Sequence, residues 1–265
     1  MRFAGLGMRV VGADVDDSGL AATLDLVRSA GADGLAVRCD VSEAADVRGL
    51  ADRTLERFGA VHLVCNNAGV FASGTCWEAS LEDYAWLLGV NVWGVVHGIR
   101  TFVPILLAQG DEGHVVNTAS MAAITNSPYA SVYTMTKHAV LGLSECLYHE
   151  LALAGGRVGV SVLCPEAVAT NIADAERARP ARWRAPDAPR SPVAALTDQA
   201  LREATAAGTD PAVMAERVER AIRERRFYVL AGGDWGRACE TRLEDVRLGR
   251  NPTFAVPGAL PSGGT

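Results

Sequence analysis

Residues 61–69 have the sequence Val-His-Leu-Val-Cys-Asn-Asn-Ala-Gly, a short apolar run followed by polar and small residues. Such a run predicts a buried β-strand over 61–65, and the residues after it predict a turn at the carboxyl end of that strand. On both sides of this stretch, strand-like and helix-like segments alternate along the chain. The alternation predicts an α/β fold, a doubly wound parallel sheet with helices on both faces.

The predicted strands are short and rich in valine, and they cover 8–13, 34–39, 61–65, 114–119, 158–164 and 227–231. The predicted helices lie between them, over 16–30, 42–58, 80–107, 131–153 and 210–225. Several of these helices begin with residues that cap helices, such as Ser80 and Asp83, or Asp210 and Pro211. No internal repeat is present, so we expect 1–265 to form a single Rossmann-like domain. Pro, Ala, Gly and Arg dominate 174–192 and the tail 251–265, which predicts mobile loops there.

Composition argues against several classes of function. The net charge is −6 and the arginines are scattered, so we expect no nucleic-acid partner. The longest apolar stretch, 90–108, is broken by Asn91, His97 and Arg100, so we expect no membrane span. The 6 cysteines lie far apart and the histidines show no metal pattern, which argues against a metal site and against a disulfide framework. A reducing, cytoplasmic location is the expectation.

Of the 25 basic residues only Lys137 is a lysine, and Tyr133 stands four positions before it. A chain that otherwise uses arginine is expected to keep a lysine where a compact ammonium is needed. On a helix, residues at this spacing share a face. An ammonium near a phenol favours the phenolate and lowers the pKa of the phenol. The pair therefore predicts a tyrosine that exchanges protons.

Polar residues follow several predicted strands: Asp14, Asp40, Asn67 and Ser120. In a doubly wound sheet, ligands bind at the carboxyl ends of the strands. The sequence therefore predicts one binding site that gathers these side chains.

These features resemble the short-chain dehydrogenase/reductase family over nearly the whole chain. The matching motifs are Asn66-Asn67-Ala68-Gly69, Asn91 in Asn-Val-Trp-Gly, Ser120 in Asn-Thr-Ala-Ser, and Tyr133-x-x-x-Lys137, in the order and spacing usual in that family. The resemblance implies that Tyr133 exchanges a proton with the substrate oxygen, and that Ser120 hydrogen-bonds that oxygen. It implies that Lys137 lowers the pKa of Tyr133 and holds the nicotinamide ribose, and that Asn91 holds a water linked to Lys137.

Each of these residues has a structural alternative. Ser120 could cap a strand end, Asn91 could be a helix residue whose amide is satisfied locally, and Asp14 could only begin a helix cap. Tyr133 could be a packed aromatic with a hydrogen-bonded hydroxyl, and Lys137 could be a solvated helix residue.

The resemblance also implies a nicotinamide cofactor. A carboxylate at Asp14 accepts hydrogen bonds from the adenosine ribose and repels a 2′-phosphate, and none of the next three residues is an arginine, so NAD is favoured over NADP. Asp40 and Val41 are expected beside the adenine. The other expected cofactor contacts are Asn67, Ala68, Gly69, Tyr133, Lys137, Pro165, Val168 and Thr170. Glu166 replaces the family's usual glycine and adds a negative charge near the expected nicotinamide ring.

The N-terminus departs from the family. The family begins with a strand and a T-G-x-x-x-G-x-G turn that binds the pyrophosphate, and neither is found in this sequence. Residues 1–4 resemble the end of the helix that follows that turn, so the first strand is expected to be missing, through a late start site or a degenerate copy. The segments 8–13 and 61–65 should then flank an open place in the sheet, or pair directly.

The favoured hypothesis is an NAD-dependent oxidoreductase that acts on a small secondary alcohol or ketone, with 171–210 as its substrate loop, and that forms a homodimer or homotetramer. An alternative is a catalytically silent relative that acts as a binding or scaffold subunit. An α/β-hydrolase that uses Ser120 is disfavoured, because the sequence lacks a G-x-S-x-G elbow.

Overall fold

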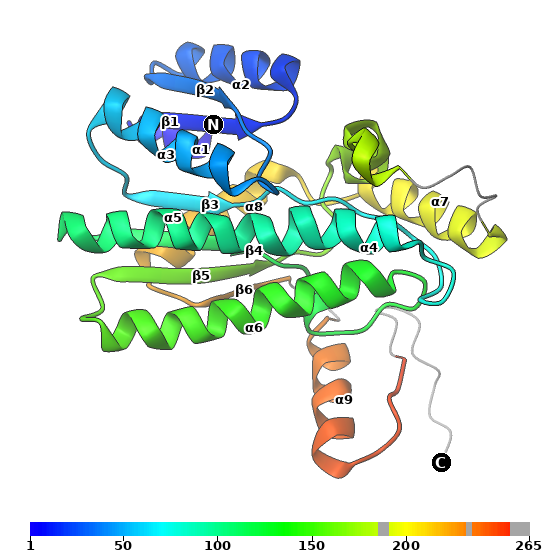
Figure 1. Cartoon of the computed structure of the whole chain (residues 1–265). Helices are drawn as coiled ribbons and strands as arrows, with labels where there is room; N and C mark the ends of the chain where they lie inside the picture. Colours follow the sequence, from blue (N-terminus) through cyan, green and yellow to red (C-terminus); the bar gives the residue numbers. More distant parts are fainter. Residues whose placement is uncertain (185–190, 232–234, 255–265) are drawn as a thin grey trace.

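Two ladders of parallel strands form the centre of the molecule (Figure 1). The computed structural model describes residues 1–184, 191–231 and 235–254, so most of the predicted tail 251–265 lies outside the described residues. In the smaller ladder, β1 (Val10–Asp14) pairs with β2 (Gly34–Arg38). The larger ladder has the order β3 (Leu63–Asn66), β4 (Gly113–Thr118), β5 (Val158–Cys164) and β6 (Tyr228–Leu230). All pairings are parallel, as the alternation of elements predicts.

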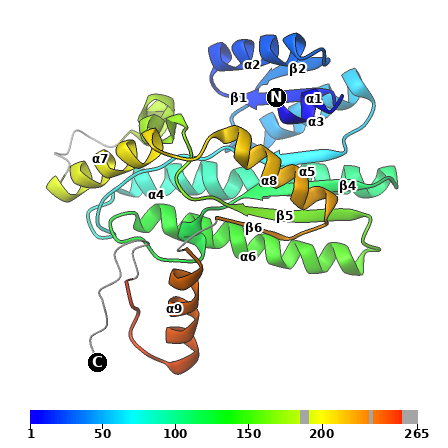
Figure 2. The same ribbon diagram turned by 180° about the vertical axis from the view of Figure 1, so that it is seen from behind.

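Helices cover both faces of these ladders. In Figure 1 α5 (Gly94–Gln109) and α6 (Ser131–Leu153) lie in front of the larger ladder, and in Figure 2 α8 (Pro211–Arg223) lies before its other face. The apolar core between α5, α6 and the strands includes Phe102, Val115 and Val160. The remaining helices are α1 (Arg2–Gly5), α2 (Asp17–Ser29), α3 (Ala44–Phe58), α4 (Leu81–Leu87), α7 (Pro192–Ala206) and α9 (Trp235–Leu248).

Most predicted elements are present, and the differences have local causes. The predicted helix 80–107 is present as helical structure from 81 to 109. Its middle turn, η1 (Leu88–Trp93), is π-helical and joins α4 to α5. The described part of 174–192, where mobile loops are predicted, contains the 3₁₀ turns η3 (Asn171–Ala178) and η4 (Ala181–Trp183) and the start of α7. Neither α7 nor α9 was expected from the sequence pattern.

The long helix from 81 to 109 also bears on the expectation of no membrane span. By length and composition it could cross a membrane. Its α5 part packs against β3 and β4, and core helices of globular proteins pass the same test, so this is weak evidence for a span.

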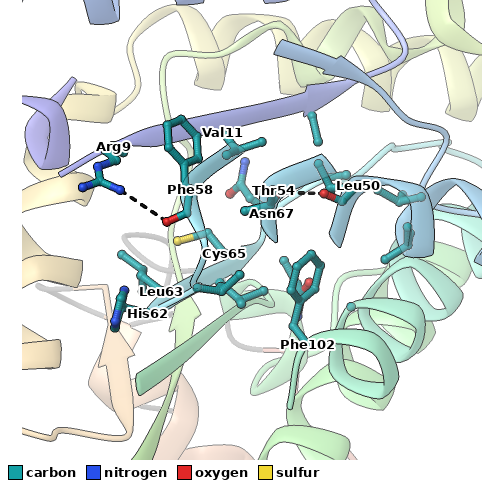
Figure 3. Close-up of a pocket in the computed structure, with 18 of the residues that line it drawn as sticks. Arg9, Val11, Leu50, Thr54, Phe58, His62, Leu63, Cys65, Asn67 and Phe102 are labelled. Atoms are coloured by element: carbon teal, nitrogen blue, oxygen red, sulfur yellow. Dashed lines mark hydrogen bonds between the residues drawn. The ribbon is translucent and has the colours of Figure 1, made fainter. Parts of the chain in front are cut away.

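The sheet is interrupted between β1 and β3. Within the described residues these two strands do not pair with each other. Of the two predicted arrangements, this corresponds to the open place in the sheet. A cavity of about 510 Å³ lies between the ladders. Figure 3 shows Val11, Phe58, Leu63 and Phe102 around this cavity. Direct closure of β1 onto β3, the other predicted outcome, is not what the structure shows.

Candidate active site

Ser120, Tyr133 and Lys137 come together beyond the carboxyl end of β4. Ser120 follows β4, and its hydroxyl hydrogen-bonds the phenol of Tyr133. Lys137 lies one turn further along α6, with its Nζ 5.5 Å from the centre of the Tyr133 ring. The Lys137 side chain is buried, and Nζ donates a hydrogen bond of 2.9 Å to the carbonyl of Thr118. The structure thus places together the three side chains that the sequence predicts.

Burial controls the proton affinities of this group. It raises the pKa of Tyr133 to about 12, although the hydrogen bond from Ser120 opposes the shift. It lowers the pKa of Lys137 to about 8. Desolvation outweighs the other influences on the phenol in this structure, and the Lys137 ammonium donates its hydrogen bond to the Thr118 carbonyl. The role of Lys137 in lowering the pKa of Tyr133 stays a prediction.

Asn91 lies in the π-helical turn η1, and its side chain is fully buried. Its Oδ1 accepts a hydrogen bond of 2.8 Å from the Val70 amide, and its Nδ2 donates to the Val70 carbonyl at 3.0 Å and to Thr136 Oγ1 at 3.1 Å. The amide of Asn91 is therefore fully hydrogen-bonded, but its partners are distant in the sequence and not local as the structural alternative supposed. Its side chain fixes the chain just after Gly69, and π-helical turns of this kind are common at functional sites.

Gly69 lies where Asn91 and Lys137 approach each other. A Cβ on Gly69 would lie 3.5 Å from Lys137 Nζ and 3.6 Å from Asn91 Oδ1. Two residues earlier, Asn67 Oδ1 accepts a hydrogen bond of 3.0 Å from the Thr118 hydroxyl. The turn from Asn67 through Ala68 to Gly69 is therefore held against the group around Lys137.

Asp14 and Asp40 lie at or just beyond the carboxyl ends of β1 and β2. Asp14 is exposed, and its Oδ1 accepts a hydrogen bond from the amide of Asp16, the residue that caps α2. The carboxylate of Asp40 accepts hydrogen bonds from the amide and hydroxyl of Ser42 and from Arg182 Nη2, at 3.0, 2.6 and 3.0 Å. Burial raises the pKa of Asp40, but these hydrogen bonds and the charge of Arg182 outweigh it, and the net shift is downward.

An arginine lies beside Asp14, which the sequence analysis did not foresee. Parallel pairing places Arg38 opposite Asp14, and the Arg38 guanidinium contacts Asp17 and the carbonyl of Val15. In the sequence, the preference for NAD rests on Asp14 and the three residues that follow it, and Arg38 is 24 positions further along the chain. The register of the two predicted strands was the signal that could have revealed Arg38.

Val41 connects the adenosine side to α5. Its carbonyl lies 2.9 Å from Nδ1 of His97, and a Cβ on Gly94 would come within 2.7 Å of its side chain. The loop after β2 is therefore seated directly on the helix that begins after the Asn91 turn.

The segment from Pro165 to Thr170 is held by the loop before α8. Val168 forms an isolated parallel bridge with Thr209, and Thr170 is the N-cap residue of η3. Glu166 Oε1 accepts a hydrogen bond of 2.9 Å from the Thr209 hydroxyl and lies 3.6 Å from Arg217 Nη1. The carboxylate of Glu166 is therefore paired with Thr209 and with Arg217 on α8 in this structure.

The family model described as short chain dehydrogenase matches residues 1–181. The chain belongs to the short-chain dehydrogenase family. This membership supports the interpretation of the protein as an oxidoreductase.

Individual short-chain dehydrogenases resemble the chain over most of its length. It is 48% identical to a short-chain dehydrogenase/reductase of Burkholderia phymatum solved in complex with NAD, with a TM-score of 0.94, covering 96% of this chain and 91% of that one. It is 35% identical to the 1-deoxy-11-beta-hydroxypentalenate dehydrogenase of Streptomyces avermitilis, covering 92% of this chain and 81% of that protein. It is 28% identical to the CLA biosynthesis dehydrogenase/reductase of Lactiplantibacillus plantarum, covering 91% and 85%.

Two aromatic residues lie beside Tyr133, and of these Phe71 was not predicted as a site residue. The rings of Phe71 and Tyr133 are 5.1 Å apart, and Trp183 packs on the same apolar cluster as Tyr133. Phe71 lies two residues after Gly69, and this closeness to the motif was the available signal.

Proposed function

We propose that the protein is an NAD-dependent oxidoreductase that interconverts a small secondary alcohol and its ketone. The observation that supports this proposal is the group formed by Ser120, Tyr133 and Lys137, with Gly69 and Asn91 against it. Such a reaction requires a proton carrier and a hydrogen-bond donor at one oxygen atom. Tyr133 and Ser120 offer both at adjacent positions.

Each residue has a proposed role in this reaction. A bound nicotinamide cofactor supplies or accepts the hydride. Tyr133 moves a proton between its hydroxyl and the substrate oxygen, while Ser120 hydrogen-bonds that oxygen. Lys137 holds the nicotinamide ribose. When the Lys137 ammonium leaves the Thr118 carbonyl to bind the ribose, its positive charge favours the phenolate form of Tyr133. Asn91 keeps the Gly69 turn in place and, as the family resemblance implies, orders a water near Lys137.

The described residues fit the adenosine part of a dinucleotide. Four of the predicted cofactor residues, Asp14, Val41, Asn67 and Ala68, lie at or beyond the carboxyl ends of β1, β2 and β3, where ligands bind in a doubly wound sheet. An exposed carboxylate at Asp14 is suited to ribose hydroxyls and repels a 2′-phosphate, which supports NAD rather than NADP, and the related Burkholderia phymatum structure contains NAD. Asp40 would lie beside the adenine, and Pro165, Val168 and Thr170 would contact the nicotinamide end.

The turn between β1 and α2 offers no binding site for the pyrophosphate. The backbone amides of this turn donate their hydrogen bonds to the carboxylates of Asp14 and Asp16. We propose that the slot between β1 and β3 takes an additional parallel strand, which a glycine-rich turn joins to α1. The apolar lining, the unpaired edges of β1 and β3, and the packing of α1 on α8 support this. A sheet edge left unpaired inside a protein is a ready template for a strand.

Titration with NAD and with NADP tests the cofactor and the added strand together. We expect weak NAD binding by the 265-residue chain and tighter binding after a strand and glycine-rich turn are fused ahead of Met1. Tight binding by the 265-residue chain alone would contradict the proposed strand. Formation of reduced cofactor from a panel of secondary alcohols then tests the reaction.

The titration also separates the second candidate function, a catalytically silent binding or scaffold subunit. The carboxylate-rich turn after β1 favours that candidate. It predicts that the fused strand leaves cofactor binding unchanged.

For the active enzyme we further propose a cytoplasmic location and a small-molecule substrate. We also propose that it forms a homodimer or homotetramer, since Leu107, Tyr148 and Leu153 leave apolar surface exposed on α5 and α6.

A further inference from the structure

The residues from Asn171 to Arg184, here called the strap, run from the Thr170 side of the site to the loop between β2 and α3. Arg179 anchors the strap firmly on α4. Its side chain is 6% exposed, its Nη2 lies 2.5 Å from Asp83 Oδ1, and its guanidinium lies 4.1 Å from the centre of the Trp86 ring. A buried charge of this kind is expensive to separate from its partner.

Trp183 makes the second contact of the strap. A Cβ on Gly89 in the π-helical turn would come within 2.7 Å of the Trp183 ring, so the indole lies directly on that turn. The same ring packs on the apolar cluster that includes Val132 and Tyr133. The position of Trp183 therefore shapes the surroundings of the proposed proton carrier.

Arg182 makes the third contact, on the adenosine side. Its Nη2 lies 3.0 Å from Asp40 Oδ2, 3.0 Å from Glu43 Oε1 and 2.9 Å from Ser42 Oγ. The guanidinium also lies 4.2 Å from the centre of the Trp183 ring. The Arg182 side chain is 45% exposed, so this contact is far weaker than that of Arg179 and is screened by salt.

We propose that Arg182 is a positioning residue that latches the strap to the loop after β2 and thereby holds Trp183 beside Tyr133. The catalytic part of this inference rests on the proposed oxidoreductase function. Because Arg182 precedes Trp183 directly and stacks on it, release of the guanidinium releases the indole as well. Asp40, an expected adenine contact, is also the latch partner, so the two ends of the site are coupled through one side chain.

Hydrogen exchange of the strap amides tests the latch without cofactor or substrate. The amides of Arg179, Trp183 and Arg184 are hydrogen-bonded within the strap and are suitable probes. We expect Arg182→Ala to speed their exchange by about 1.4- to fivefold, the range for exposed ion pairs. Glu43→Gln should have a smaller effect, and the conservative Arg182→Lys should restore part of the protection. Arg184→Ala is the matched control, since no described contact joins Arg184 to Asp40, Ser42 or Glu43.

Salt gives a second reading of the same contact. Raising the ionic strength should speed strap exchange in the wild-type protein but not in Arg182→Ala. Equal exchange in the wild type, Arg182→Ala and Arg184→Ala would overturn the latch, whatever the activity of the protein.

Kinetics then test the coupling to Tyr133. In an active preparation we expect Arg182→Ala to lower kcat for the alcohol and to weaken NAD binding, with Arg182→Lys intermediate in both. If Arg182→Ala speeds strap exchange but leaves kcat and NAD affinity unchanged, the latch is supported and its coupling to Tyr133 is overturned. A protein inactive toward every alcohol would count against the proposed function, and the exchange result would still decide the latch.

Discussion

Tyr133 and Lys137 show how one physical cause moves two proton affinities in opposite directions. Burial disfavours the charged form of each side chain, so the pKa of the phenol rises to about 12 and that of the ammonium falls to about 8. At neutral pH the phenol therefore keeps its proton, and the Lys137 amine, with its pKa still above neutrality, remains mostly protonated. The pair becomes reactive only when something in the site stabilises the phenolate.

Tyr133→Phe removes the proposed proton carrier and keeps the ring that packs against Phe71. We expect turnover to fall by a factor on the order of 10² to 10⁴, with an unchanged circular dichroism spectrum. Steady-state kinetics at saturating alcohol measure the loss. Full activity in the folded variant would refute the role given to Tyr133.

Lys137→Met should alter how stability depends on pH. The folded-state pKa of Lys137 is lowered from 10.5 to about 8, so between these values the unfolded chain binds the proton more tightly. The resulting destabilisation is fully present below about pH 8 and is relieved as the pH rises toward about 10.5. The variant should therefore gain stability over the wild type near neutral pH, by on the order of 3 kcal/mol or less, and lose this advantage toward about pH 10.

Urea unfolding of both proteins, between about pH 7 and about pH 10, measures that difference. Tyr133, with its raised pKa, destabilises the fold only as the pH rises above about 10, outside this range. If the stability difference between the two proteins does not change with pH, burial does not shift the pKa of Lys137.

Asp14→Ala should narrow the preference for NAD over NADP. Removing the carboxylate relieves repulsion of a 2′-phosphate and leaves Arg38 opposite that position in the ladder. The ratio of dissociation constants for the two cofactors, measured in the strand-restored protein, reports the change. A parent protein that already prefers NADP would contradict the role of Asp14.

At the scale of elements, α5 is held on β3 by a close approach at Gly98. A Cβ there would lie 1.9 Å from Asn66 Oδ1. Asn66 donates a hydrogen bond of 2.8 Å to Asn117, which donates one of 2.9 Å to Ser144 on α6. This chain of buried polar groups joins α5, β3, β4 and α6.

Gly98→Ala should therefore break the chain and destabilise the protein by about 1–3 kcal/mol. Gly49→Ala on α3 is the matched control, because a Cβ there would meet nothing within 4 Å. That change should stabilise the helix by about 0.5–1 kcal/mol. Thermal unfolding compares the two, and equal melting temperatures would disprove the close approach.

Elements that depend on local sequence could be predicted, and contacts between distant segments could not. The bounds of α6 and β5 match the predictions, because the pattern of apolar residues specifies them. The strap looked irregular in the sequence, since its order comes from the contact of Arg179 with Asp83, far away along the chain. The group of Ser120, Tyr133 and Lys137 was predictable from motif spacing, whereas the pKa of Tyr133 depends on burial, which spacing does not specify.

At the scale of the whole molecule, the two ladders share core side chains but no strand pairing within the described residues. Ala13 in β1 and Cys39 just after β2 pack in the same apolar core as residues of β3, β4 and β5. Arg9 donates a hydrogen bond to the carbonyl of Phe58 at the end of α3. These contacts keep the slot open to a strand while holding its two walls in one fold.

An interrupted sheet also divides the folding cooperativity of the molecule. Backbone pairing transmits cooperativity across a sheet, and here it stops at the slot. The part from β1 through β2 should then open as a separate unit, at a lower free energy than β4 and β5. Thermal unfolding should show two steps, the first confined to the residues before Asp40. An added strand that fills the slot should merge them into one transition.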